Sequence, residues 1–138
     1  MYESRNRPIL SRMIFTDRPL DVVVATGRPA TRAALTALLE SEPRLRAAGV
    51  AGDLPTAVRL IRATDPDAML IDRTVLGPGD GRLRMLAASM PGVAVFLVGM
   101  GDHPRLDANA RDAGAAGYIR LDEAPERLSG ALVSRLAA

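Results

Sequence analysis

The amino-acid sequence predicts an α/β fold in which a doubly wound, five-stranded parallel sheet is covered by helices on both faces. Short apolar runs alternate with longer segments whose apolar residues recur at helical spacing, from residue 21 to the end of the chain. The clearest run is DAMLID at residues 67–72, where four apolar positions lie between two aspartates. Such a run is typical of a central parallel strand buried on both faces. Asp72 would then emerge at the carboxyl end of that strand, where open α/β sheets carry their functional groups.

The length and composition indicate one globular domain. The chain has 138 residues, of which 48% are hydrophobic and 25% charged, and these values are ordinary for a folded protein. Because the chain has no cysteine, disulfides and thiolate metal sites are excluded. No apolar run approaches the roughly 18 residues of a membrane span, and the start of the chain lacks the apolar segment of a signal peptide. We therefore expect a cytoplasmic protein without membrane contact.

The charges divide the chain into two parts. All 18 basic residues are Arg, and the chain has 16 acidic residues. Residues 1–20 hold four Arg and two acids. From residue 21 onward, 14 Arg therefore face 14 acids. Residues 1–20 contain two prolines and no sustained period, which predicts a flexible or loosely docked basic arm before a domain at residues 21–138. A neutral domain without a basic face predicts no direct binding of nucleic acid.

The first half of the domain predicts five elements. A β-branched run, Val22-Val23-Val24, suits a strand, and Pro29 suits the first turn of a helix in which Leu35, Leu38 and Leu39 share a face. Prolines then separate the later elements. The expected order is a strand at 22–24, a helix at 29–40, a weaker strand at 45–50, a helix at 54–64 and the strand at 67–72.

The second half repeats the alternation. The glycine-rich segment 77–81 predicts a loop and no phosphate-binding fingerprint, because the glycine spacing is wrong and no Lys follows. Gly114 is expected to cap a helix. The expected order is a helix at 83–90, a strand at 93–98, a loop at 99–104, a helix at 106–113, a strand at 117–121 and a helix from residue 125.

Four segments carry a resemblance to a known family. They are RPATRAALTALLE at 28–40, PDAMLID at 66–72, PGVAVFLV at 91–98 and AGAAGYI at 113–119. Residues 21–137 resemble the receiver domain of bacterial two-component response regulators, especially those that precede a helix-turn-helix output domain in transcription regulation. The resemblance implies the (βα)5, flavodoxin-like receiver fold. The chain ends near the end of the last expected helix, which suits a stand-alone regulator or the front of a longer one.

The resemblance assigns roles to positions at the strand ends. Asp72 occupies the position of the aspartate that accepts a phosphoryl group from a histidine kinase. Thr26 and Gly27 stand where two acids normally bind Mg²⁺ together with that aspartate. Gly99 replaces a Ser or Thr that normally bonds the phosphoryl oxygen, and Leu121 replaces a Lys that normally pairs with it.

These replacements predict a pocket that binds Mg²⁺ weakly or not at all. Mg²⁺ prefers octahedral oxygen ligands that include one or two carboxylates, and phosphoryl transfer needs cations to offset charge on the transferred group. Thr26 offers only a neutral hydroxyl. Arg120 neighbours the vacant Lys position, but alternation along the strand points it away from Asp72. Two loop residues, Arg28 and Arg73, remain as alternative sources of a positive charge.

The signalling switch of the family is altered too. The resemblance matches Tyr118 to an aromatic residue that rotates inward when the fourth-strand hydroxyl moves, and Gly99 has no hydroxyl. We therefore expect Tyr118 to be a fixed packing or interface residue. The expected interface for a partner or a homodimer lies on the fourth helix, fifth strand and fifth helix, and includes Arg111, Tyr118 and Arg120. His103, the only histidine, lacks the partners that a catalytic or metal-binding role needs.

The sequence thus predicts a degenerate receiver, a pseudo-receiver without enzymatic activity or cofactor, that acts as a phosphorylation-independent interaction or dimerisation module in bacterial signalling. One alternative is a receiver that a histidine kinase still phosphorylates on Asp72 in a phosphorelay. Another is a module that binds a small anion through Arg28 and the helix start at Pro29.

Overall fold

The computed structural model describes residues 18–123 and 125–137. Most of the predicted arm, residues 1–17, lies outside this range. The first strand begins earlier than expected, because Leu20 is buried and its amide bonds to the carbonyl of Arg44 at 2.8 Å. Leu20 therefore belongs to the sheet and not to the arm.

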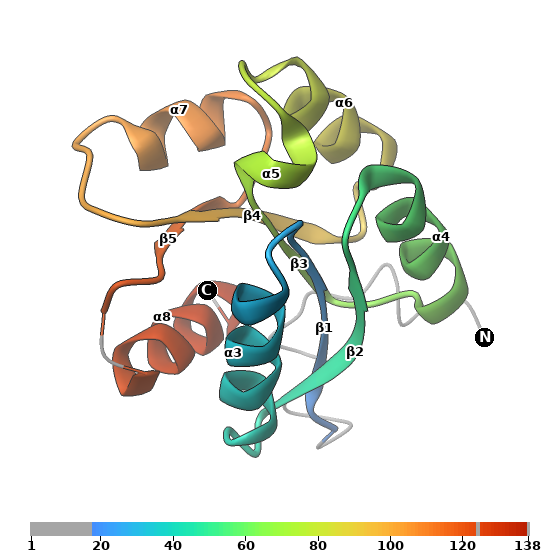
Figure 1. Ribbon diagram of the computed structural model, residues 1–138, viewed down its shortest axis with the longest axis vertical. Coiled ribbons are helices and arrows are strands. Elements are labelled where there is room, and N and C mark those ends of the chain that lie inside the picture. The colour runs from blue at the N-terminus through green and yellow to red at the C-terminus, as the bar shows by residue number, and fades with distance from the viewer. Residues whose placement is uncertain (1–17, 124, 138) are drawn as a thin grey trace.

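The described elements form the predicted five-stranded parallel sheet, in the order β2-β1-β3-β4-β5 (Figure 1). The strands are β1 (Leu20–Ala25), β2 (Leu45–Ala51), β3 (Ala68–Ile71), β4 (Ala94–Gly99) and β5 (Gly117–Arg120). The helices are α3 (Pro29–Glu40), α4 (Leu54–Thr64), α5 (Arg73–Leu76), α6 (Gly81–Ser89), α7 (Leu106–Asp112) and α8 (Pro125–Ala137). The doubly wound α/β fold is confirmed.

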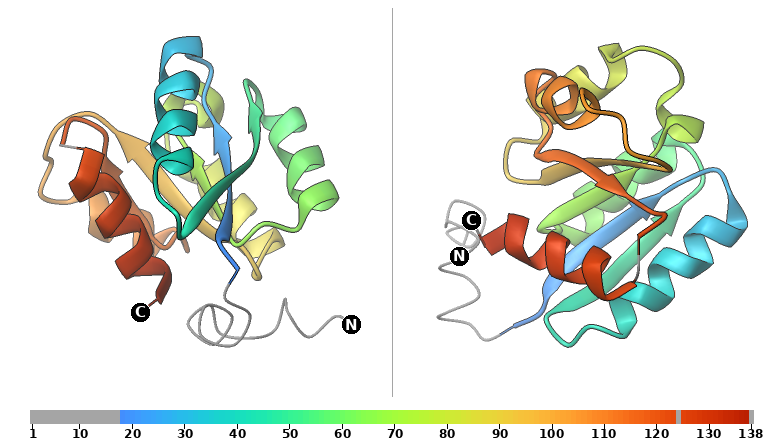
Figure 2. Two further views of the ribbon diagram at one scale, coloured as in Figure 1. Left: turned by 90° about the horizontal axis from the view of Figure 1, so that it is seen from below. Right: turned by 90° about the vertical axis from the view of Figure 1, so that its left-hand side faces the viewer.

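Helices cover both faces of the sheet, and a separate hydrophobic core lies under each set (Figure 2). On one face, α3 and α8 pack over Val22, Val24, Leu70 and Phe96 with the side chains of Leu35, Leu39, Leu128, Leu132 and Leu136. On the other face, α4, α5, α6 and α7 pack over Val23, Met69, Ile71 and Leu97. All four side chains of β3 are buried, as its apolar run predicts.

Local chemistry sets the helix ends. Pro29 occupies the first turn of α3, where a missing amide hydrogen carries no penalty. The Asp53 carboxylate caps α4 by accepting a bond from the Thr56 amide at 2.8 Å. Gly114 follows α7 with a φ of +97°, a left-handed conformation that favours glycine.

The structure adds one helix that the sequence pattern did not predict. Residues 73–76 form α5 directly after β3, inside the segment that was expected to connect β3 to the loop at 77–81. Four residues are too few to show helical periodicity. Among the other elements, α6 ends at Ser89 and not at Met90, and α7 ends at Asp112, one residue before Ala113.

Candidate functional site

The Asp72 side chain lies at the carboxyl edge of the sheet and is 8% exposed. Its Oδ2 accepts a hydrogen bond from the Thr26 hydroxyl at 2.6 Å. Its Oδ1 accepts bonds from the amide of Thr74 at 3.1 Å and from the Thr74 hydroxyl. Asp72 is also the N-cap residue of α5. The carboxylate therefore caps α5 and accepts its hydrogen bonds from neutral donors.

Thr26 is fully buried and connects Asp72 to β1, β2 and α3. Its amide bonds to the Ala51 carbonyl at 3.0 Å, and its own carbonyl accepts a bond from the Arg32 guanidinium at 2.8 Å. The Thr26 hydroxyl, besides donating to Asp72, accepts a bond from the Arg28 amide at 3.2 Å. Arg28 therefore contributes its backbone to this network.

Thr74 fills the space beside Gly27. The Gly27 amide donates to the Thr74 hydroxyl at 2.6 Å. A Cβ atom on Gly27 would lie 3.1 Å from that hydroxyl oxygen and 3.2 Å from the Thr74 Cβ. A longer acidic side chain at position 27 would therefore have to displace Thr74.

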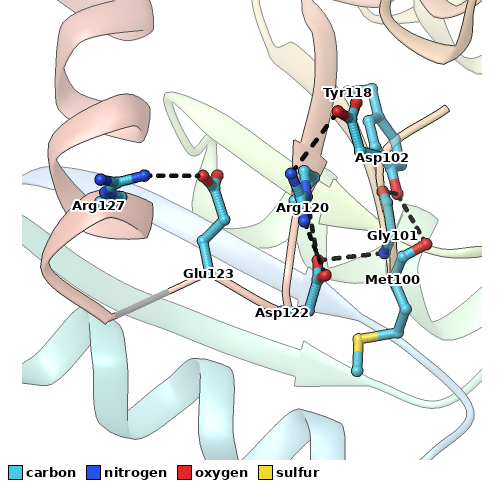
Figure 3. A network of polar contacts seen from close by, with 8 residues as sticks. All are labelled: Met100, Gly101, Asp102, Tyr118, Arg120, Asp122, Glu123 and Arg127. Atoms are coloured by element: carbon cyan, nitrogen blue, oxygen red, sulfur yellow. Dashed lines mark hydrogen bonds and ion pairs between the residues drawn. The ribbon is translucent and has the colours of Figure 1, made fainter. Parts of the chain in front are cut away.

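Two arginines near the strand ends pair with acids other than Asp72. The Arg73 guanidinium bonds to the Gly79 carbonyl and to the Asp80 carboxylate, the latter at 2.7 Å, and so does not contact Asp72 in this structure. Arg120 bonds to Asp122 at 2.9 Å and lies 3.8 Å from Asp102 (Figure 3). The pKa of Asp122 lies below its ordinary value because of the bonds from Arg120 and from the Gly101 amide.

The Tyr118 ring covers Gly99 at the end of β4. A Cβ atom on Gly99 would lie 3.1 Å from the Tyr118 hydroxyl oxygen and 3.2 Å from a ring carbon. That hydroxyl donates to the carbonyls of Gly101 at 3.0 Å and Met100 at 3.3 Å, which ties the ring to the loop after β4 (Figure 3). Burial and the neighbouring carboxylate of Asp122 raise the pKa of Tyr118 above its ordinary value, so the phenol is neutral and remains a donor.

No family model matches the chain. Over 105 residues it is 33% identical to protein-glutamate methylesterase/protein-glutamine glutaminase 3 of Myxococcus xanthus, an alignment that covers 75% of this chain and 29% of that protein. Over 118 residues it is 29% identical to response regulator UvrY of Escherichia coli O6:H1, covering 83% of this chain and 53% of that protein. The chain therefore spans about half the length, or less, of these curated relatives.

The fold matches a solved receiver structure closely. The signal receiver domain of a response regulator, NarL, from Mycobacterium tuberculosis superposes with a TM-score of 0.75 and 25% sequence identity, covering 86% of this chain and 97% of that one. The chain is thus similar in sequence and in fold to the receiver domains of response regulators. Asp72, Thr26, Gly27, Gly99 and Leu121 can therefore be considered together as the strand-end positions of a receiver.

The residues of this receiver do not fit a Mg²⁺ ion. Asp72 supplies one carboxylate, but both of its oxygens already accept bonds from threonines. Position 27 has no side chain, and Thr74 occupies the space beside it. Within residues 18–123 and 125–137, no group of three or more acidic, His or Cys side chains could hold a metal ion. The strand ends therefore lack the oxygen ligands that a Mg²⁺-dependent phosphoryl transfer requires.

Leu121 lies close to two helices, α3 and α8. Its amide still bonds to the Gly99 carbonyl at 2.8 Å, which continues the pairing of β5 with β4. Its side chain packs against the core under α3 and α8 and lines a groove between these helices. The receiver thus has an apolar side chain where the family has an ammonium group.

Asp107 joins the three elements of the expected interface. Its carboxylate accepts bonds from the Tyr118 amide at 2.9 Å, from Arg111 at 2.8 Å and from Arg135 at 2.9 Å, so it connects α7 to β5 and α8. Burial alone would raise the pKa of Asp107, but these bonds outweigh it and lower that pKa to about 2. Gly117 has a φ of +150°, a backbone conformation that L side chains rarely adopt, which explains the glycine before Tyr118.

Sequence reasoning missed three residues of this site: Thr74, Arg32 and Asp107. Thr74 follows Asp72 by two residues, a spacing that suits an N-cap bond and could have indicated the contact. Arg32 and Asp107 bond to residues of other elements, which the tertiary fold brings close to them. The sequence around them contains no local pattern that predicts these contacts. His103 lies in an exposed loop and lines a shallow hollow beside Tyr118.

Proposed function

We propose that this receiver works without phosphorylation, as a non-enzymatic cytoplasmic module that acts through contacts with other proteins. The observation that carries the proposal is the bonding of Asp72. Its carboxylate is buried, accepts three hydrogen bonds from two threonines, and lies beside a position where Thr74 takes the place of a metal-binding acid. A phosphoryl group on Asp72 would have to break these bonds without a cation to compensate its charge.

The relatives support a role in bacterial two-component signalling. UvrY is a response regulator, and the chain is similar to about half of it. The enzymatic name of the Myxococcus xanthus relative belongs to a protein of which this chain matches 29%, so it gives no reason to propose a methylesterase or glutaminase activity. Within the described residues, none of the helices has the length and apolar character needed to cross a membrane.

Phosphorylation can be tested directly. Incubation with acetyl phosphate and Mg²⁺, followed by intact-mass measurement, is expected to leave the protein unmodified under conditions that label an ordinary receiver. Mg²⁺ is also expected to leave the melting temperature unchanged, because the ligand set is incomplete. The Asp72→Asn variant is the matched control for labelling at other residues. Stoichiometric addition of one phosphoryl group, absent from Asp72→Asn, would instead favour the phosphorelay alternative.

We further propose that partners or a second copy bind the surface formed by α7, β5 and α8. Tyr118 is a weaker interface candidate than the sequence indicated, because its ring packs on Gly99 and its hydroxyl bonds inward. Charged side chains on the same elements are exposed, including Arg111 at 54% and Arg127 at 78%. Exposed ion pairs contribute only about 0–1 kcal/mol each, so they are free to exchange their partners at an interface.

If a homodimer forms there, Arg111→Glu should lower the apparent mass in sedimentation experiments, since the substitution places like charges in the interface. Arg62→Glu on α4, which lies outside the surface formed by α7, β5 and α8, makes the same charge change and should leave the mass unaltered. Melting curves of both variants check that the fold is intact. A wild-type protein that is monomeric at high micromolar concentration would contradict the homodimer and leave a different protein as the partner.

A further inference from the structure

An apolar groove of about 550 Å³ lies between α3 and α8. The two helices lie next to each other on the same face of the sheet (Figures 1 and 2). The groove is separate from the Asp72 network, and it shares only α8 with the surface formed by α7, β5 and α8. Its apolar lining includes Ala30, Ala34, Leu38, Met100, Leu121 and Leu128.

The groove leaves apolar side chains partly uncovered. Met100 at its rim is 67% exposed, one of the most exposed large hydrophobic side chains in the described part of the chain. Leu38 shares the apolar face of α3 with Leu35 and Leu39, but it packs only against the edge of the core and stays half-buried. Among the described residues that line the groove, Glu123 alone is charged. A contiguous apolar hollow with a polar rim is typical of a surface that binds an apolar segment.

We propose that this groove binds residues 9–15 of the same chain. That segment, ILSRMIF, lies outside the described residues and contains five apolar side chains. Ile9, Leu10, Met13 and Ile14 have the i, i+1, i+4, i+5 spacing that places them on one face of a helix. An amphipathic helix that lays such a face into an apolar groove is a recurring mode of recognition.

The charges of the two surfaces are complementary. Residues 1–17 contain three Arg and two acids. Glu123 lines the groove, and the adjoining hollow is lined by Glu126 together with Glu42 and Arg44, which pair with each other, so both surfaces carry excess negative charge. Glu123 lies 3.8 Å from Arg127, a long pair on an exposed Arg that a closer cation could replace.

The chain is long enough to reach the groove. The bond from the Leu20 amide to the Arg44 carbonyl places the start of β1 near the end of α3, where Ser41 lines the groove. The 12 residues of α3 span about 18 Å at 1.5 Å per residue. Residues 1–17 would span about 25 Å as a helix and more if extended. Residues 9–15 can therefore extend from Leu20 along α3.

The attachment of the segment to the domain favours it over a second copy as the occupant. A short tether keeps a segment at an effective concentration on the order of millimolar. A second copy would have to make equivalent apolar contacts at the much lower concentration of the free protein. The groove is therefore filled by the segment of its own chain.

Paramagnetic relaxation in the full-length chain tests this inference, and the absence of native cysteine makes labelling simple. A nitroxide is attached to Ala33→Cys, an exposed position on α3 beside the groove but outside its lining. The amide signals of residues 9–15 are expected to lose most of their intensity. A nitroxide on Met85→Cys, exposed on α6 on the opposite face, is the matched control and should leave those signals nearly unchanged.

Two further measurements complete the test. In a mixture of isotope-labelled wild type with unlabelled, spin-labelled Ala33→Cys, the signals should keep their intensity, because the contact is within one chain. Adding Ile14→Asp to the labelled Ala33→Cys chain should restore the lost intensity. The inference is overturned by equal signals with the two label positions, by broadening in the mixture, which would identify a second copy, or by broadening that survives Ile14→Asp.

Discussion

Asp72→Ala is expected to lower the free energy of unfolding by about 2–4 kcal/mol. The substitution removes the N-cap of α5, worth about 0.5–2 kcal/mol. It also leaves the fully buried Thr26 hydroxyl without its acceptor, which costs about 1–3 kcal/mol. Urea denaturation followed by circular dichroism measures the change. A loss below about 0.5 kcal/mol would show that the three bonds to Asp72 do not hold the loop.

Two control variants separate these contributions. In Asp72→Asn the side-chain oxygen can still accept from Thr74, but the amide group replaces the acceptor of Thr26, so a loss of about 1 kcal/mol is expected. In Asp72→Ala with Thr26→Val the unpaired hydroxyl is absent, so the double variant should be more stable than Asp72→Ala.

Gly99→Thr, which restores the hydroxyl residue typical of a receiver, is expected to destabilise this protein by about 1–3 kcal/mol. The new Cβ would lie 3.1 Å from the Tyr118 hydroxyl, and the additional atoms of Thr require more room. The ring would have to leave the carbonyls of Met100 and Gly101, to which its hydroxyl bonds. Thermal denaturation with matched buffers measures the loss.

The contact between Gly99 and Tyr118 predicts a coupling between the two positions. In a Tyr118→Ala background the same Gly99→Thr change should cost much less, because the ring is gone. Gly81→Thr is the matched control for the loss of a glycine, since a Cβ at Gly81 meets no atom within 4 Å. Additive effects of Gly99→Thr and Tyr118→Ala would show that the ring moves aside without cost.

The sequence predicted the fold well because each strand and helix carries a local signal. The apolar run of β3 and the spaced leucines of α3 and α8 depend on burial periodicity, which can be read along the chain. Leu20 was missed because a single apolar residue after Pro19 shows no period. The four-residue helix α5 was missed for the same reason.

The candidate site was predicted in its positions but not in its bonding. Strand ends locate Asp72, Thr26 and Gly99 at one edge of a parallel sheet. The pattern could not show that Thr74 turns back to bond Asp72 or that Tyr118 covers Gly99, because both depend on side-chain rotamers set by packing. The sequence therefore indicated which groups are missing, and the structure showed what fills their places.

The bonds of Asp107 have a consequence for motion in this protein. One carboxylate contacts the β5 backbone, Arg111 on α7 and Arg135 on α8. A movement of α7 away from the sheet would break its bonds to β5 and to α8 together, which couples the three elements in local unfolding. A conformational change that began in α7 would therefore not reach β5 and α8 through a gradual sliding of that helix. It would have to release all three elements together.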